Sequence, residues 1–418
     1  MRTSLLRASG ALAAAGTLIL LGPAAAGAAG QPAATITSAG IAQVTASGPV
    51  WAWGLNSTGQ LGDGTTISSD LPVKVKLPAG TKVTAVSAGR RHSLALTSTG
   101  QVLAWGGNLH GELGDGTTTS SDIPVPVKLP HGVKVIAIAA GDNFNLALTS
   151  AGRVLAWGWN AFGQLGNGTT ATSDVPVRVM LPAGAKVTAV SAGGGFSLAL
   201  TSTGRVLAWG RNREGQLGIG VTRHRHHPVP VLLPRDTRVT AIAAGQIHSL
   251  ALTAAGRVLA WGNNSIGQLG NGTTKSSDIP VAVKLRRFIR VTAIASGGYH
   301  GLALTTTGHI LGWGNNADGE LACRRPCGTS DNVIPLRMKL PAGTKVTAIA
   351  AGFFHSLVLT RAGHILACGA NFDGELGDGT NTDSRVLVRA RLAPGLFAAA
   401  VARGPNAKQS LVIVHHTG

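Results

Sequence analysis

The sixteen-residue stretch VLAWGGNLHGELGDGT (residues 102–117) decides the fold, because versions of it recur along most of the chain. Its Trp-Gly pair returns every 52 residues, and a last copy, 55 residues further on, has cysteine in place of tryptophan. The seven copies begin at Trp53, Trp105, Trp157, Trp209, Trp261, Trp313 and Cys368. The rest of the unit reads Ser-Asp-x-Pro-Val, Leu-Pro-Ala-Gly, Lys-Val-Thr-Ala and Ala-Gly-x-x-His-Ser-Leu-Ala-Leu-Thr. A repeat of about 50 residues indicates a solenoid or a propeller.

Each unit contains four short stretches of β-forming residues separated by turn formers. In the second unit we expect strands at 83–88, 93–97, 102–105 and 125–129. No stretch has the long 3.6-residue periodicity of helical repeats. Because four strands make one blade, the seven units predict an all-β, seven-bladed β-propeller over residues 30–418.

The phase of the repeat predicts how the ring closes. The Ala-Gly segment that begins each unit occurs eight times, the last as Arg403-Gly404, whereas Trp-Gly or Cys-Gly occurs seven times. The run 410–414 is therefore a surplus strand, which we expect to pair with residues 50–54 of the first blade. Strands from both ends of the chain would then close the ring and remove its open sheet edges.

Composition narrows the class of protein. The chain has 418 residues, 44% of them hydrophobic, with 59 glycines and a net charge of +19. This apolar content is enough for a core, so that the chain is not a disordered polyelectrolyte. Three cysteines are too few for a disulfide scaffold or a four-cysteine zinc site.

The N-terminus has the order of a secretory signal peptide. Arg2 and Arg7 precede an apolar run at 8–21, and small residues follow through Ala29. We expect residues 1–29 to be removed between Ala26 and Gly30, leaving a secreted or cell-envelope-associated protein without a transmembrane segment. The alternative is an uncleaved anchor, although an apolar run of this length and composition spans a bilayer poorly.

The motifs Trp-Gly-x-Asn-x-x-Gly-Gln-Leu-Gly and Ala-Gly-x-x-His-Ser-Leu-Ala-Leu resemble those of the regulator of chromosome condensation repeat family, over roughly residues 36–414. The resemblance implies a seven-bladed propeller. Well-known eukaryotic members are nuclear exchange factors for a small GTPase that also bind chromatin, and related secreted bacterial propellers inhibit β-lactamases with one face. The signal peptide and the lack of an insertion long enough for a protruding hairpin favour a secreted bacterial member over an exchange factor.

Most repeated positions have a structural interpretation. The tryptophans are expected in the blade core, and the asparagine two residues beyond each Trp-Gly is expected to bind loop backbone. The aspartates before x-Pro (Asp70, Asp122, Asp174 and Asp278) predict an Asx turn that closes the glycine loop. Four histidines share a repeat position with Phe144 and Phe196, which excludes a ring of metal ligands there; they are His92, His248, His300 and His355.

Two loops of each unit vary in sequence from unit to unit: the one after Ala-Gly and the one after Trp-Gly. Because successive strands run in opposite directions, both loops are expected on the same face of the ring, near its axis. Aromatic residues are only 4% of the chain, yet six fall in these loops. Aromatic and arginine side chains are typical anchors of protein interfaces. The candidate binding residues are Arg90, Arg91, Asn143, Trp159, Phe162, Arg211, Arg213, Tyr299, Phe353, Phe354 and Phe372. The alternative is that the loop tips are simply unconstrained.

An enzyme is not expected, and no catalytic residue, metal or cofactor is predicted. Glycoside hydrolysis needs two carboxylates at one pocket, and Glu214, Asp318 and Asp373 share a repeat position but belong to three different blades. The chain lacks the phosphate-binding, nucleophile-elbow and zinc-protease motifs. A glycan-active propeller and a GTPase exchange factor remain the alternatives to a protein-binding scaffold.

The remaining charged and sulfur-containing residues have local interpretations. Basic residues spread over every unit predict a positive rim, which would discourage aggregation or attract an anionic cell-envelope polymer. They are not interleaved with aromatics as in single-strand nucleic-acid binders. The loop 223–227 (RHRHH) is a solvated basic loop or a metal or anion site, and Cys323 and Cys327 are candidates for a local disulfide. We expect a monomer that binds a protein.

Overall fold

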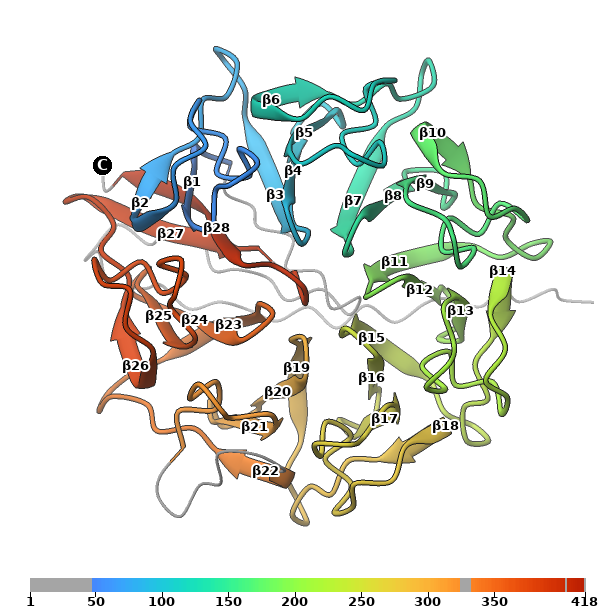
Figure 1. Ribbon diagram of the computed structural model, residues 1–418. Coiled ribbons are helices and arrows are strands. Elements are labelled where there is room, and N and C mark those ends of the chain that lie inside the picture. The colour runs from blue at the N-terminus through green and yellow to red at the C-terminus, as the bar shows by residue number, and fades with distance from the viewer. Residues whose placement is uncertain (1–46, 324–331, 403, 417–418) are drawn as a thin grey trace, which may run out of the picture. The chain divides into compact units, whose positions relative to one another are not determined.

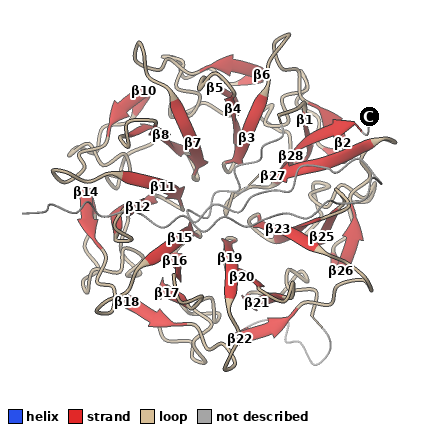
Figure 2. Ribbon diagram, turned by 180° about the vertical axis from the view of Figure 1, so that it is seen from behind, coloured by secondary structure: helices blue, strands red, loops and turns tan. Residues whose placement is uncertain are grey.

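Seven four-stranded antiparallel sheets stand around a central axis in the computed structural model, which describes residues 47–323, 332–402 and 404–416 (Figures 1 and 2). These residues contain no helix. The predicted all-β, seven-bladed propeller is therefore confirmed. The proposed signal peptide at 1–29 and Cys327 lie outside the described residues.

Each blade has an innermost, a second, a third and an outermost strand. The innermost strands are β3 (Val83–Ala88), β7 (Val135–Ala140), β11 (Val187–Ala192), β15 (Val239–Ala244), β19 (Val291–Ser296), β23 (Val346–Ala351) and β27 (Leu396–Val401). The second strands are β4 (His92–Thr97), β8 (Phe144–Thr149), β12 (Phe196–Thr201), β16 (His248–Thr253), β20 (His300–Thr305), β24 (His355–Thr360) and β28 (Gln409–His416). The third strands are β1 (Val50–Gly54), β5 (Val102–Gly106), β9 (Val154–Gly158), β13 (Val206–Gly210), β17 (Val258–Gly262), β21 (Ile310–Gly314) and β25 (Ile365–Gly369). The outermost strands are β2 (Ser69–Lys74), β6 (Ser121–Pro126), β10 (Ser173–Arg178), β14 (Arg225–Pro230), β18 (Ser277–Ala282), β22 (Asn332–Arg337) and β26 (Ser384–Arg389).

Strands from both ends of the chain form the closing sheet, which we call blade 1; blades 2 to 7 follow in chain order. Its strand order is β2-β1-β28-β27. β28 pairs antiparallel with β1, with Val50 opposite Ile413 and Ala52 opposite Leu411. The predicted closure is confirmed, and the ring has no unpaired edge between its first and last strands.

Tryptophans of the third strands fill the space between neighbouring blades. Trp105 of blade 2 is fully buried and packs in one cluster with Val50, Leu61 and Val75 of blade 1. Its Nε1 donates a hydrogen bond to the Gln60 carbonyl oxygen at 2.9 Å. The repeated tryptophan is thus a core residue, as predicted, and it stabilises contacts between blades as well as within them.

The asparagine that recurs two residues after each Trp-Gly or Cys-Gly holds the glycine loop together. Asn56 Nδ2 donates to the carbonyl oxygens of Thr65 and Ile67 at 3.1 and 3.0 Å, and Asn56 Oδ1 accepts from the Leu61 amide at 2.8 Å. The expected binding to loop backbone is confirmed.

Two local predictions are wrong. The fourth strand of blade 2 is β6 at Ser121–Pro126 and not 125–129, because the pairing with β5 includes a bulge that brings Ser121 opposite Gly106. The Asx turn is formed within the glycine loop, where Asp63 Oδ1 accepts from the Thr65 amide at 3.1 Å. The aspartates before x-Pro instead contact the preceding blade, as where the Asp122 carbonyl oxygen accepts from the Gly64 amide at 2.9 Å.

Candidate binding face

The two ends of the ring differ in the connections they carry. At one end, which we call the loop face, the first strand of each blade connects to the second and the third connects to the outermost. At the other end, the turn face, lie the short turns from second to third strands and the segments that lead into the next blade. Successive antiparallel strands reverse direction, so that all eleven predicted binding residues lie in loops of the loop face.

Aromatic residues of the loop face form two clusters. In the first, on blades 2 to 4, Phe162 is 5.1 Å from both Trp159 and His224 between ring centroids, and the Arg211 guanidinium lies 5.6 Å from its ring. His110 extends this cluster to blade 2, 6.0 Å from Trp159. The Trp159–Phe162 contact is edge-to-face and the Arg211–Phe162 contact is a cation–π interaction, two arrangements that aromatic rings favour over face-to-face stacking.

The second aromatic cluster joins blades 6 and 7. Phe353 and Phe354 are 4.3 Å apart in an edge-to-face arrangement, and Tyr299 is 5.5 Å from Phe353. The three rings are each partly exposed. They therefore present an apolar surface that is fixed by mutual packing before any partner binds.

A polar pair of residues bridges two non-neighbouring blades at this face. Gln246 of blade 5 donates from Nε2 to Asp142 Oδ2 of blade 3 at 3.1 Å, passing over the Gly194-Gly195 loop of blade 4. A Cβ on Gly194 would lie 2.6 Å from the Gln246 side chain, so glycine is required for this crossing. Asp142 is 9% exposed, and its Oδ1 has no hydrogen-bond partner among the described residues, nor has Gln246 Oε1.

The charges around this pair act on one another. Burial raises the pKa of Asp142, and its hydrogen bond from Gln246 and the positive charges of Arg90 and Arg211 oppose that rise. Burial also raises the pKa of Tyr299, and the negative charge of Asp142 raises it further. Residues of blades 2, 3, 4 and 6 thus form one electrostatic unit at the loop face.

The other predicted residues are more peripheral. Arg91 and Arg213 are exposed, and Phe372 is 73% exposed and belongs to neither aromatic cluster. Asn143 is partly buried, and its carbonyl oxygen accepts from the Trp159 amide at 2.8 Å.

Several polar residues of this face were not among the sequence candidates. Asp142, Gln246, His110 and His224 all occupy variable loop positions, but only the fold shows which of them meet. Asn406, in the corresponding loop of blade 1, is 1% exposed, and neither its Oδ1 nor its Nδ2 has a partner among the described residues. For Asp142 and Gln246, the signal that could have found them is the glycine pair at 194–195, which occupies the same repeat position in the unit between theirs.

The repeated histidines connect neighbouring blades. His92 Nε2 lies 2.7 Å from Asn145 Oδ1, and His300 Nε2 lies 3.0 Å from Ser356 Oγ. Burial lowers the pKa of His92 to about 4 and that of His300 to about 3, so that both are neutral near pH 7. Across the described ranges no group of three or more His, Cys, Asp or Glu side chains could hold a metal ion.

Neither the basic histidine loop nor the three carboxylates forms an evident reactive centre. His224 Nδ1 accepts from the Asn212 amide at 2.9 Å, which ties the loop to its own blade. Glu214 Oε2 accepts from Asn263 Nδ2 at 3.0 Å, whereas the charge on Asp318 interacts with those of Asp383 and Arg385. The expected disulfide of Cys323 and Cys327 stays a prediction, since Cys327 is outside the described residues.

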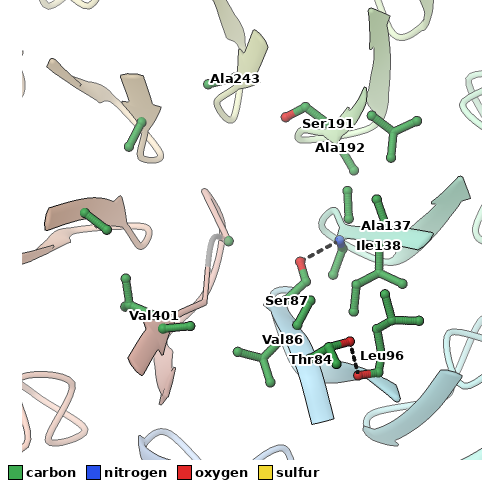
Figure 3. A pocket seen from close by; sticks show the side chains of 18 of the residues that line it. Thr84, Val86, Ser87, Leu96, Ala137, Ile138, Ser191, Ala192, Ala243 and Val401 are labelled. Atoms are coloured by element: carbon green, nitrogen blue, oxygen red, sulfur yellow. Dashed lines mark hydrogen bonds between the residues drawn. The ribbon is translucent and has the colours of Figure 1, made fainter. Parts of the chain in front are cut away.

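A cavity of about 430 Å³ runs along the axis between the innermost strands (Figure 3). Its wall consists mainly of Ala, Val, Ile, Ser and Thr side chains, and Lys134 is its one charged lining residue among the described parts of the chain. The wall is braced by Ser87 Oγ, which accepts from the Ala140 amide at 3.0 Å. The described residues that line it include no carboxylate and no histidine.

Among the described residues, no helix has the length and apolar character needed to cross a membrane. Comparison with known proteins agrees with the repeat analysis. A family model described as RCC1-like domain matches residues 175–412, and one described as regulator of chromosome condensation (RCC1) repeat matches residues 47–96 and 99–148.

Relatives of known name share the repeat over different parts of their length. The ultraviolet-B receptor UVR8 of Arabidopsis thaliana is 32% identical over 335 residues, which are 80% of this chain and 76% of UVR8. The human E3 ubiquitin-protein ligase HERC2 is 36% identical over 265 residues, which are 63% of this chain but 6% of HERC2. The chain therefore matches a small part of that ligase.

Solved structures agree on the fold. Yeast RCC1 (Prp20), in its crystal structure with Kap60, has a TM-score of 0.81 at 24% identity, covering 90% of this chain and 91% of the other. Human WBSCR16 has a TM-score of 0.79 at 24% identity, covering 88% and 99%. At this identity the likeness is one of fold alone.

Proposed function

Because the chain belongs to the regulator of chromosome condensation (RCC1) repeat family, we propose that it is a protein-binding scaffold and that the loop face is its recognition surface. A propeller family indicates a scaffold and not a particular activity, so the proposal depends on the site. The observation that carries it is the pairing of two preformed aromatic clusters with the buried, incompletely bonded Asp142–Gln246 pair on one face.

The geometry favours a partner with an apolar surface and a hydrogen-bond donor near its centre. Phe162 and Phe353 would supply apolar contact in the two clusters, where a rigid aromatic ring loses little entropy on binding. Asp142 Oδ1 and Gln246 Oε1 are buried acceptors without a described partner, so an N–H of the bound protein would reach them only if the surrounding loop side chains moved aside.

The test is capture of partners by the purified protein from the medium and envelope of the producing cells. The variants Trp159→Ala/Phe162→Ala and Phe353→Ala/Phe354→Ala are expected to lose the captured protein while their melting temperature stays close to that of the wild type. Phe288→Ala is the matched control for capture of dissolved proteins from the medium, because Phe288 is an exposed aromatic of the turn face. Capture that survives both loop-face variants, or that is lost equally in the control, would contradict the proposal.

We propose also that residues 1–29 direct export of the protein. Its partner would then be a secreted or envelope protein, such as an enzyme that the loop face binds and inhibits. The support is the charge and hydropathy order of the N-terminus. Intact-mass measurement of the exported protein should give a chain that begins between residues 27 and 30. A full-length chain confined to the cell interior would contradict export and would favour the regulation of an intracellular GTPase, which a nucleotide-exchange assay would then examine.

A further inference from the structure

The turn face carries a nearly uniform positive charge. It is formed by six short turns (98–101, 150–153, 202–205, 254–257, 306–309 and 361–364) and by seven segments that lead into the innermost strands (78–82, 130–134, 182–186, 234–238, 286–290, 341–345 and 393–395). These segments contain thirteen Lys or Arg residues, and all thirteen are exposed: Lys82, Lys134, Arg153, Lys186, Arg205, Arg235, Arg238, Arg257, Arg286, Arg287, Arg290, Lys345 and Arg361. Asp236 is the single acidic residue among them.

The loop face does not share this charge. The variable loops there contain carboxylates as well as arginines, for example Asp142, Glu214 and Asp373 beside Arg90 and Arg211. Thirteen of the 31 described Lys and Arg residues therefore lie on the turn face, where one carboxylate accompanies them, and others, such as Lys74, Lys128 and Arg178, lie on or just after the outermost strands.

The basic residues of the turn face lie at a common level along the axis. Six of them occupy one repeat position immediately before an innermost strand: Lys82, Lys134, Lys186, Arg238, Arg290 and Lys345. A backbone hydrogen bond fixes each of these residues to the neighbouring short turn. For example, the Lys82 carbonyl oxygen accepts from the Ser98 amide at 2.8 Å, and the Lys186 carbonyl oxygen accepts from the Ser202 amide at 2.9 Å. Because equivalent positions of a closed ring lie at equal height, these charges form a broad planar array and not a groove.

One aromatic side chain projects from this array. Phe288 is 95% exposed and has a φ of 68°, a backbone conformation that is strained for a bulky residue. Glycine takes the same place in five other connections, and nothing lies within 4 Å of the Cβ position at Gly80, Gly132 or Gly184. Phe288 therefore projects into open space, and its one ring contact is with Arg287, whose guanidinium carbon lies 5.7 Å from the ring centroid.

We propose that the turn face docks on an anionic lipid bilayer, with the basic array against the headgroups and Phe288 inserted at the interface. A planar array matches a planar anionic surface, and an aromatic ring flanked by arginines is suited to the boundary between headgroups and acyl chains. A nucleic-acid strand would need a groove or several exposed stacking rings. Besides Phe288 the turn end has the rings of His364, Phe397 and His415, but these are partly buried and contact one another. Docked in this way, the protein would hold its loop face away from the membrane, free for a partner. The inference does not depend on the proposed partner.

The experiment is co-sedimentation of the full chain with phosphatidylcholine vesicles that contain either no anionic lipid or about 30% phosphatidylglycerol. We expect binding only to the anionic vesicles, and its loss in high salt. Lys82→Glu/Lys186→Glu/Lys345→Glu should weaken binding by roughly fivefold or more for each residue changed. Arg90→Glu/Arg91→Glu/Arg213→Glu changes the net charge equally on the loop face and should retain most of the binding.

Insertion of Phe288 has its own measurement. Phe288→Gly restores the residue found in five other connections, so it should fold normally and yet bind anionic vesicles several-fold more weakly than the wild type. Phe288→Trp should show an emission shift to shorter wavelength on these vesicles and quenching by brominated acyl chains. Equal binding by the two charge variants, equal binding by Phe288→Gly, or a duplex DNA fragment or an anionic polymer that binds more tightly than the vesicles would overturn the proposal.

Discussion

Replacing Cys368 by tryptophan is expected to destabilise the ring by itself and to stabilise it once two neighbouring residues are also changed. In the other interfaces a tryptophan packs against a glycine of the preceding blade, as with Trp261 and Gly218, where a Cβ on the glycine would lie 2.8 Å from Trp261 Cδ1. At the interface between blades 6 and 7, Cys368 occupies the position of the tryptophan and Ala322 occupies the position of the glycine. The two changes accompany each other because a Cβ and an indole cannot share this space.

A third residue compensates for the lost volume. Met338, 2% exposed, packs in one cluster with Ala322 and Cys368 at the position where Val231 stands beside Trp261. Its longer side chain occupies part of the space that an indole would fill. The pair Ala322→Gly/Met338→Val should therefore be needed before a tryptophan fits fully at residue 368.

The magnitudes follow from these contacts. Cys368→Trp alone overpacks the interface and should cost about 1–3 kcal/mol of unfolding free energy. With Ala322→Gly and Met338→Val the indole is buried, can donate to the Glu320 carbonyl oxygen that now accepts from Cys368 Sγ at 3.3 Å, and relieves the φ of 38° at Ala322. Since truncating a buried aromatic costs about 3–5 kcal/mol and cysteine already fills part of the site, the triple variant should gain about 1–3 kcal/mol.

The assay is urea denaturation of the wild type, the single variants and the combinations, arranged as a mutant cycle. A coupling of at least about 2 kcal/mol between residues 322 and 368 is expected. Gly218→Ala, made opposite Trp261, is the converse control and should destabilise, with partial recovery on adding Trp261→Cys. A Cys368→Trp variant that is as stable with Ala322 as with glycine would refute the reasoning.

Three further predictions concern the scaffold. Truncation after Ser410 removes Leu411, Val412, Ile413 and Val414, all fully buried, and should lower the melting temperature of the whole ring in calorimetry; an unchanged transition would count against closure by β28. Asn160→Ala removes an amide that bonds the Thr169 and Ala171 carbonyl oxygens at 3.1 and 2.9 Å, and should cost about 1–3 kcal/mol in denaturant titration, whereas Asn167→Ala, in the same loop but more exposed, should cost less. Burial lowers the pKa of His248 to about 3, so the stability it contributes is present above pH 6.5 and is lost as the pH falls from there toward 3, because the unfolded chain takes up the proton first. Burial raises the pKa of Glu112, Glu320 and Glu375 from 4.5 to about 7, which opposes this loss while the pH falls from about 7 to 4.5. Replacing the three by glutamine should therefore steepen the acid destabilisation in that range by up to roughly 4 kcal/mol per pH unit; parallel pH profiles of the variant and the wild type would disprove this.

Local regularities account for what could be predicted. The 52-residue spacing predicted the number of blades, and the surplus strand at 410–414 predicted the closure. Both could be predicted because each repeat forms one sheet that packs against its neighbours, which leaves few possible topologies. The errors were equally local. The outermost strand begins at Ser121 because a bulge shifts its register, and bulges leave little signal in strand propensity.

Sequence alone determined the all-β ring, the buried tryptophans and the loops that carry the variable residues, because each depends on residue type at a fixed spacing within one covalent unit. Only the tertiary structure decided which of those residues meet. Asp142 and Gln246 are 104 positions apart and touch because blade 4 has glycines between them. Thirteen basic residues share the turn face because the leading segments and the short turns lie at the same end of each blade. Contacts between non-neighbouring blades depend on how the blades are arranged in the ring, and no spacing within one repeat encodes them.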